Sequence, residues 1–172
     1  YLYLGDNARV PYGSRSVETI RQFSEEAMLY FIKEKVPLVI IACNTSSAAA
    51  LRYLQEKYGD RMKILGVIRP LAEYAGKKTK KKKIGVVGTR ATIESKAYDE
   101  EIKKLDSSIK IFGQACQLLV PLIEEGWHKK PETKMILRKY LRGLKSHNVD
   151  TLILGCTHYP VLYKDFEQIM GK

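Results

Sequence analysis

Short apolar runs alternate with amphipathic stretches along most of the 172 residues. The runs are rich in Val, Ile and Leu, as are the buried strands of parallel sheets. The predicted strands are residues 1–4, 36–42, 62–68, 83–88, 109–112 and 151–154. The predicted helices are residues 16–35, 46–58, 70–76, 93–105, 118–125, 133–146 and 160–170. Strands that alternate with helices indicate an α/β fold with mostly parallel sheets, built from right-handed βαβ units.

Strands lie on both sides of a lysine-rich run at residues 77–83, and they are too many for one small sheet. We therefore expect two pseudo-symmetric α/β lobes, each a mostly parallel sheet flanked by helices, with an active site in the crevice between them. The first lobe is expected over residues 1–78 and the second over residues 79–155. Residues 156–172 are expected to return towards the first lobe.

Two of the predicted strands end in the same way. Cys43 follows one strand through Ala42, Cys156 follows another through Gly155, and polar residues and a helix come next in both places. The carboxyl ends of the strands line the crevice in such sheets, and a helix N-terminus favours a thiolate and binds anions. Two thiols that face one crevice suit proton transfer at Cα, because one removes a proton and the other returns one. The alternative is that both are ordinary buried residues, as free cysteines often are.

The formal charge is +11, from 30 Lys and Arg against 19 Asp and Glu. Such a charge is compatible with binding to nucleic acid or to an anionic membrane. Six of the lysines lie in the run at residues 77–83, however, and the other basic residues are scattered. A solvated linker explains the run better than a nucleic-acid site does.

The cysteines and histidines show neither a disulfide framework nor the spacing of a zinc site. There are three cysteines far apart in sequence, and His128 and His147 lie alone among polar residues. The sequence contains neither a Gly-x-Gly-x-x-Gly pattern nor a P-loop, so we expect no metal and no cofactor. It also shows no signal peptide and no long apolar span, so we expect a cytoplasmic protein that does not enter a membrane.

Three stretches resemble the signature motifs of the glutamate racemases, in the aspartate/glutamate racemase superfamily. They are Leu4-Gly-Asp-Asn-Ala-Arg-Val-Pro-Tyr-Gly13, Ala42-Cys-Asn-Thr45 and Leu154-Gly-Cys-Thr-His-Tyr-Pro160. The resemblance extends along essentially the whole chain. It implies cofactor-independent interconversion of L- and D-glutamate, which supplies D-glutamate for peptidoglycan. A related aspartate racemase is the nearest alternative among enzymes.

The resemblance also implies roles for individual residues. Cys43 and Cys156 would be the two acid/base residues, and His158 would assist Cys156, with Glu124 near the histidine. From the residues alone, His158 has the alternative of capping the following helix, and Glu124 that of a solvated surface acid. The residues implied to bind substrate are Pro11, Tyr12, Gly13, Asn44, Thr45, Thr89, Thr92 and Thr157. Cys116 has no Asn, Thr or His neighbour and no helix start after it, so we interpret it as structural.

The sequence departs from the family pattern in two respects. Relatives begin with a strand that ends in Asp-Ser-Gly and close with a further strand and helix, and this chain has neither. We therefore expect a fragment or a naturally shortened relative, with a first lobe that lacks its leading strand. Arg69 and Leu71 also stand where relatives usually have Glu and Gly.

We expect glutamate as the substrate and a homodimer as the assembly. The rival from another class is an inactive racemase-like chain that binds a partner protein such as DNA gyrase, or binds nucleic acid. Salt separates the two hypotheses, because binding to phosphates weakens steeply as the salt concentration rises. Racemisation should instead depend on both cysteines.

Overall fold

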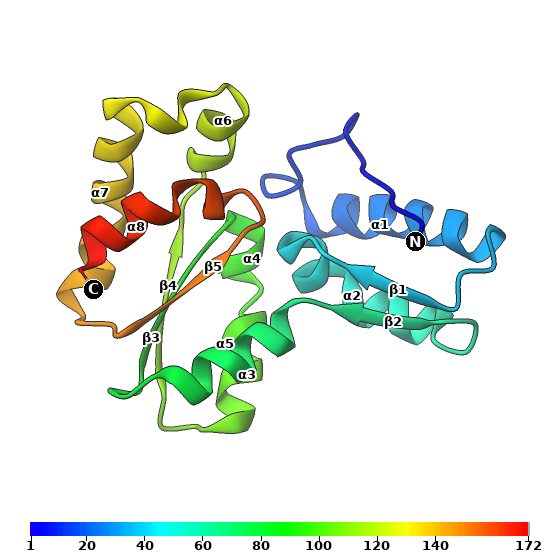
Figure 1. The fold of residues 1–172 in the computed structure, drawn as a ribbon. Helices are drawn as coiled ribbons and strands as arrows, with labels where there is room; N and C mark the ends of the chain where they lie inside the picture. Colours follow the sequence, from blue (N-terminus) through cyan, green and yellow to red (C-terminus); the bar gives the residue numbers. More distant parts are fainter. Residues whose placement is uncertain (172) are drawn as a thin grey trace.

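The structure, a computed structural model, describes residues 1–171 and contains two separate parallel sheets. The first part of the chain forms α1 (Val17–Lys33), β1 (Leu38–Ile41), α2 (Asn44–Tyr58), β2 (Lys63–Gly66) and α3 (Ile68–Lys78). The second part forms β3 (Lys83–Gly88), α4 (Arg90–Glu94), α5 (Ala97–Leu105), β4 (Lys110–Ala115), α6 (Leu119–Glu124), η1 (Trp127–Lys129), α7 (Pro131–Ser146), β5 (Thr151–Gly155), η2 (Tyr159–Leu162) and α8 (Tyr163–Met170). Figure 1 shows the two sheets in neighbouring lobes, and the predicted α/β class with two lobes is confirmed.

The first lobe pairs β1 with β2, so that Val39 lies opposite Ile64. Both side chains are buried against α1 and α2, with Met28 and Leu54 in the same cluster. On the other face of this sheet, Ile40 remains 61% exposed. A cavity of about 490 Å³ lies on that face. It is lined by Ile40, Leu65, Gly66, Val67, Pro70, Leu71 and Tyr74. Within residues 1–171, the first sheet is therefore packed on one face only.

The second lobe has the strand order β4-β3-β5, and helices cover both faces of its sheet. Ile84 and Val86 of β3 pack with Ile102 of α5 on one face. Val87 packs with Leu137 of α7 on the opposite face. Consecutive residues of β3 point to opposite faces, as in any strand, and a parallel sheet needs an apolar cover on each.

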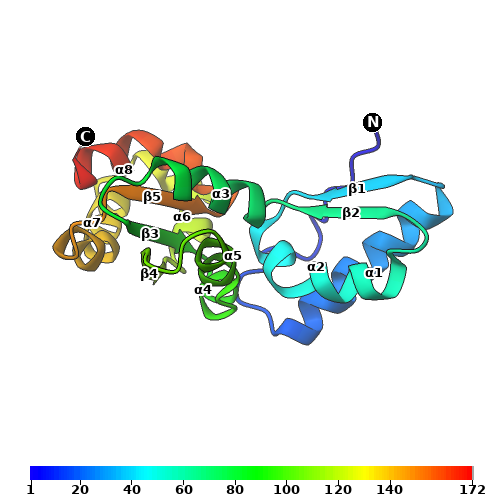
Figure 2. The same cartoon turned by 90° about the horizontal axis from the view of Figure 1, so that it is seen from below.

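Helix α3 follows the first sheet in the chain but packs on the second. Its residues Ile68, Ala72 and Ala75 are buried in one cluster with Ile84 of β3 and Tyr98 of α5. Figure 2 shows α3 alongside the second lobe. This packing favours a division between the lobes before α3, and not at the expected boundary between residues 78 and 79.

The C-terminal segment does not return to the first lobe over the residues that the structure describes. Tyr159 and Leu162 of η2 and Phe166 of α8 are buried in the cluster that contains Leu137 and Leu141 of α7. In Figure 1 this segment runs across the second lobe, and its C-terminal end lies on the side away from the first lobe. The expectation for residues 156–171 is corrected on this point, and residue 172 lies outside the described residues.

Most predicted elements are present, and three differ. Residues 1–4 do not form a strand, because no strand lies beside them to pair with, and Tyr1 and Tyr3 are exposed. The helix expected to about residue 105 is interrupted at Lys96, whose φ of 57° is left-handed. The last helix begins as the 3₁₀ turn η2 before α8. The first helix begins where it was expected, because the Ser16 hydroxyl caps α1 by accepting a hydrogen bond from the Thr19 amide.

A helix that crosses a bilayer needs about 20 apolar residues. Within residues 1–171, none of the helices combines the length and the apolar character that such a span requires.

Candidate active site

Cys43 lies at the carboxyl end of the first sheet, two residues after β1. It occupies the N-cap position of α2 in an extended conformation, with φ of −73° and ψ of 124°. Its side chain makes no capping hydrogen bond, and the residue is half-buried. The thiol is therefore accessible at the N-terminus of a 15-residue helix, where free N–H groups favour negative charge.

Cys156 lies at the carboxyl end of the second sheet, immediately after β5, and is 7% exposed. Burial, with a smaller contribution from negative charge on Cys43, raises the pKa of its thiol to about 11, although hydrogen bonds from the backbone N–H groups of His158 and Tyr159 act in the opposite direction. Each of the two thiols thus lies at the carboxyl end of a parallel strand. One comes from each lobe, and the crevice expected between them remains a prediction.

His158 links Cys156 to an acidic residue. Its Nδ1 lies 3.7 Å from the Cys156 sulfur, and its Nε2 is paired with the Glu124 carboxylate at the end of α6. The ring makes no capping hydrogen bond to η2, which it precedes. A carboxylate on one ring nitrogen sets the tautomer and orients the other nitrogen towards its partner. The arrangement can move a proton to or from the buried thiol.

Three threonine hydroxyls meet where the lobes touch. Thr45 Oγ1, from the first lobe, lies 2.9 Å from Thr89 Oγ1 and 3.4 Å from Thr92 Oγ1, both from the second. All three side chains are buried, and Thr89 also caps α4 by accepting from the Thr92 amide. Asn44 is held across the same junction by the hydroxyl of Tyr98, which donates to Asn44 Oδ1 at 2.6 Å.

The loop at residues 5–13 docks on the second lobe through Gly13. A Cβ at this position would lie 2.4 Å from the Cβ of Thr89, so only glycine allows the approach. Tyr12 donates its hydroxyl hydrogen to the Asp6 carboxylate. Burial first, and then that hydrogen bond, raise the pKa of Tyr12, and negative charge on Cys43 contributes in the same direction. The loop therefore contacts the second lobe beside the threonine cluster.

The structure thus brings most of the predicted site residues to one junction between the lobes. Pro11 and Thr157 are exposed beside it, each next to a residue of the site. Sequence reasoning missed Asp6 and Tyr98. Asp6 lies in the same motif as Tyr12, which is a signal that could have identified it. Tyr98 occupies an inward position of a helix, and such a position gives no functional signal.

Cys116 follows β4 as directly as Cys156 follows β5, and α6 begins three residues later at Leu119. The expectation that no helix starts after it is therefore wrong. Its structural role is supported by burial, since it is fully inaccessible and its thiol donates to the Gln114 carbonyl at 3.6 Å. Burial raises the pKa of this thiol to about 12.

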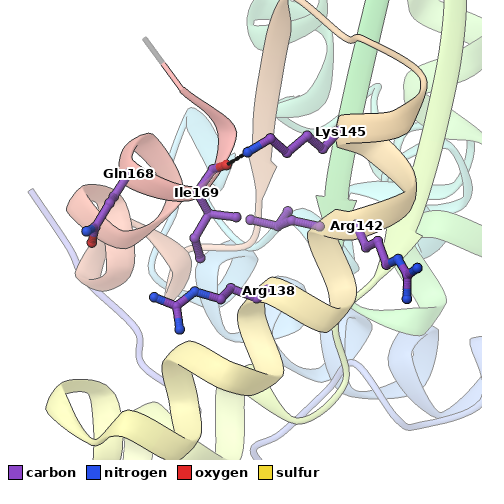
Figure 3. A pocket seen from close by; sticks show the side chains of 6 residues that line it. Arg138, Arg142, Lys145, Gln168 and Ile169 are labelled. Atoms are coloured by element: carbon purple, nitrogen blue, oxygen red, sulfur yellow. Dashed lines mark hydrogen bonds between the residues drawn. The ribbon is translucent and has the colours of Figure 1, made fainter.

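A second hollow, of about 380 Å³, lies between α7 and α8 (Figure 3). Its lining includes Arg138, Arg142 and Lys145. Lys145 donates from Nζ to the Ile169 carbonyl at 3.0 Å, so it satisfies the C-terminal end of α8. A cation at a helix C-terminus stabilises the helix through its dipole, which accounts for the position of Lys145. Within residues 1–171, the His, Cys, Asp and Glu side chains form no group of three that could hold a metal ion.

Comparison with known proteins identifies the family to which this chain belongs. A sequence model described as Asp/Glu/Hydantoin racemase matches residues 1–172. The chain belongs to this racemase family. Glutamate racemase of Chlorobaculum tepidum is 45% identical over 99% of the chain and 62% of its own length. That of Geobacter metallireducens is 42% identical over 99% of the chain and 63% of its own length.

Solved structures of the racemase family agree with the fold. A glutamate racemase isoform of Bacillus anthracis superposes with a TM-score of 0.92 at 39% identity, over 98% of this chain and 62% of that one. Glutamate racemase of Francisella tularensis, in complex with D-glutamate, gives a TM-score of 0.90 at 35% identity, over 96% of this chain and 62% of that one. The chain thus spans about three fifths of the length of these relatives.

Proposed function

We propose that the protein that contains this chain interconverts L- and D-glutamate without a cofactor. The observation that carries the proposal is the pair of thiols at two strand ends, one from each lobe, whose neighbouring residues Asn44 and Gly155 both contact Tyr98. The relatives named glutamate racemase, and the neighbour bound to D-glutamate, support glutamate as the substrate.

In the proposed reaction the thiolate of one cysteine removes the Cα proton of glutamate, and the thiol of the other gives a proton to the opposite face. His158 holds or relays a proton at the sulfur of Cys156, and Glu124 keeps the imidazole in place. The Asn44 side chain, the threonine hydroxyls and the N–H groups at the start of α2 bind the charged ends of the substrate. Pro11, Tyr12, Gly13 and Thr157 line the same site.

We also propose a cellular role and a compartment for the reaction. A D-glutamate supply serves peptidoglycan synthesis in the cytoplasm, as it does in the family. We further propose a homodimer. Contact with DNA gyrase and with nucleic acid remains the alternative.

The test is hydrogen–deuterium exchange at Cα of L- and D-glutamate in D₂O, followed by proton NMR. We expect exchange with inversion for the unmodified chain, and its loss, by at least about 10³-fold, in Cys43→Ala and in Cys156→Ala. Cys116→Ala is the matched control and should exchange at the unmodified rate. Loss of exchange in the Cys116 variant alone would overturn the assignment, and absence of exchange in the unmodified chain would reject the function for these 172 residues.

A further inference from the structure

Tyr98 is a buried residue of α5 that touches both cysteine loops. It is 2% exposed, and its hydroxyl donates to Oδ1 of Asn44, the residue after Cys43, at 2.6 Å. Its ring also packs against the residue before Cys156, since a Cβ at Gly155 would lie 3.2 Å from Cε2 of the ring. One side chain of the second lobe thus contacts the chain next to each thiol.

We propose that Tyr98 is a positioning residue, which turns the donor side of the Asn44 amide towards an anionic substrate and holds the two cysteine loops at a set separation. This inference rests on the proposed function for its substrate. It concerns a residue that would act through its neighbours and that does not itself contact the reacting atoms.

The chemistry of the amide gives the first step. An asparagine side chain has an acceptor oxygen and an NH₂ group with two donors, and these point in different directions. The Tyr98 hydroxyl engages the oxygen, so the NH₂ group faces away from the tyrosine. Two N–H donors match a carboxylate, whereas the oxygen would repel one. The phenol therefore selects the amide orientation that suits glutamate.

The packing around Tyr98 gives the second step. Its ring lies in one cluster with Ile84, Val86 and Ile102, in the core of the second lobe. A side chain in a close-packed core has a single well-defined position. Burial first, and then negative charge on Cys156, raise the pKa of Tyr98, so the hydroxyl keeps its proton and stays a donor. The position of the Cys43 loop is thereby fixed relative to the core of the second lobe, which also holds Cys156.

Tyr98→Phe separates positioning from packing, because it keeps the ring and removes the donor. Tyr58→Phe is the matched control. Tyr58 is also a buried tyrosine, its hydroxyl donates to Glu25, and it ends α2, about 20 Å from Asn44 at the rise of an α-helix. Each variant loses one side-chain hydrogen bond, buried at Tyr98 and part-buried at Tyr58, so both should lower the melting temperature by a few degrees.

The experiment combines a glutamate titration with NMR of the Asn44 side-chain amide in ¹⁵N-labelled chain. We expect Tyr98→Phe to weaken D-glutamate binding about tenfold and to shift both Asn44 N–H signals, with most other signals unmoved. Tyr58→Phe should bind within twofold of the unmodified chain and leave the Asn44 signals in place. Equal weakening in both variants, or wild-type binding in Tyr98→Phe, would overturn the proposal.

The two readouts also separate this inference from the proposed function. If the unmodified chain neither binds glutamate nor exchanges its Cα hydrogen, the proposed function fails. The Asn44 signals then still decide on positioning, since unchanged signals in Tyr98→Phe would reject it and shifted signals would support it. If glutamate is bound and racemised and Tyr98→Phe behaves as the unmodified chain, only the inference about Tyr98 fails.

Discussion

Cys43 and Cys156 follow parallel strands in the same way, and their surroundings differ. Cys43 is half-buried and begins a 15-residue α-helix. Cys156 is 7% exposed and is followed by a 3₁₀ helix of four residues, but it has an imidazole at 3.7 Å and a carboxylate behind that imidazole. A long helix favours negative charge at its N-terminus, and a single 3₁₀ turn offers much less. We infer that His158 and Glu124 provide at the second thiol the assistance that α2 provides at the first.

Apart from removal of the thiols themselves, the largest expected effect concerns the residues that precede the two cysteines. Gly155→Ala would place a Cβ 2.9 Å from the Val87 carbonyl oxygen, so the loop of Cys156 must move. We expect about a 10²-fold slower Cα exchange, because a displacement of about 1 Å at a reacting group has this cost. Ala42→Gly is the matched change before Cys43. Ala42 is exposed, so the exchange rate should stay within a few-fold. Similar losses in both variants would show that the two loops are equally constrained.

The next effect concerns the assistance to Cys156. Glu124→Gln removes the charge that holds His158 and keeps the size of the side chain. The Glu124 side chain is 59% exposed, which limits the effect, so we expect exchange from one glutamate enantiomer to fall about tenfold. Exchange from the other enantiomer should change less than twofold. Glu125→Gln, at the neighbouring exposed position, is the control, and an equal loss for both enantiomers would contradict a role confined to Cys156.

The smallest effect is a change of stability with pH. Burial raises the pKa of Cys116 from the ordinary 9.0 to about 12, so the folded chain holds this proton where the unfolded chain releases it. The contribution is complete below pH 9 and is lost as the pH rises towards 12. At pH 10 the unfolding free energy should fall by about 1 kcal/mol on this account.

Urea unfolding at pH 8 and pH 10 measures that change, with Cys116→Ala as the comparison. The variant should lose about 1 kcal/mol less than the unmodified chain over this interval, and its Cα exchange should be unaltered. Cys156, with a pKa of about 11, contributes to both proteins alike. An equal loss in the two proteins would show that the Cys116 thiol does not titrate in this range.

Much of the fold followed from local patterns. The start of the first helix and the end of the helix expected at residues 118–125 were predicted well, because both depend on nearby residues. Ser16 caps α1, and Gly126, with a left-handed φ of 72°, follows the end of α6. The strand expected at residues 1–4 was wrong, since an apolar run forms a strand only beside a partner. The place of α3 also depended on a partner, because its apolar face packs on the second sheet.

The sequence by itself determined that two cysteines end two parallel strands, because that placement depends only on the residues next to each thiol. The three motifs likewise indicated the family. Only the tertiary structure decided that Cys116, at the end of a third strand, is inaccessible, and that Tyr98 joins the two cysteine loops. Burial and side-chain contacts arise between residues far apart in the chain, and no local pattern records them. The physical reason is that the end of a strand fixes the position of a cysteine in the fold, whereas the packing around the thiol fixes its exposure and its contacts.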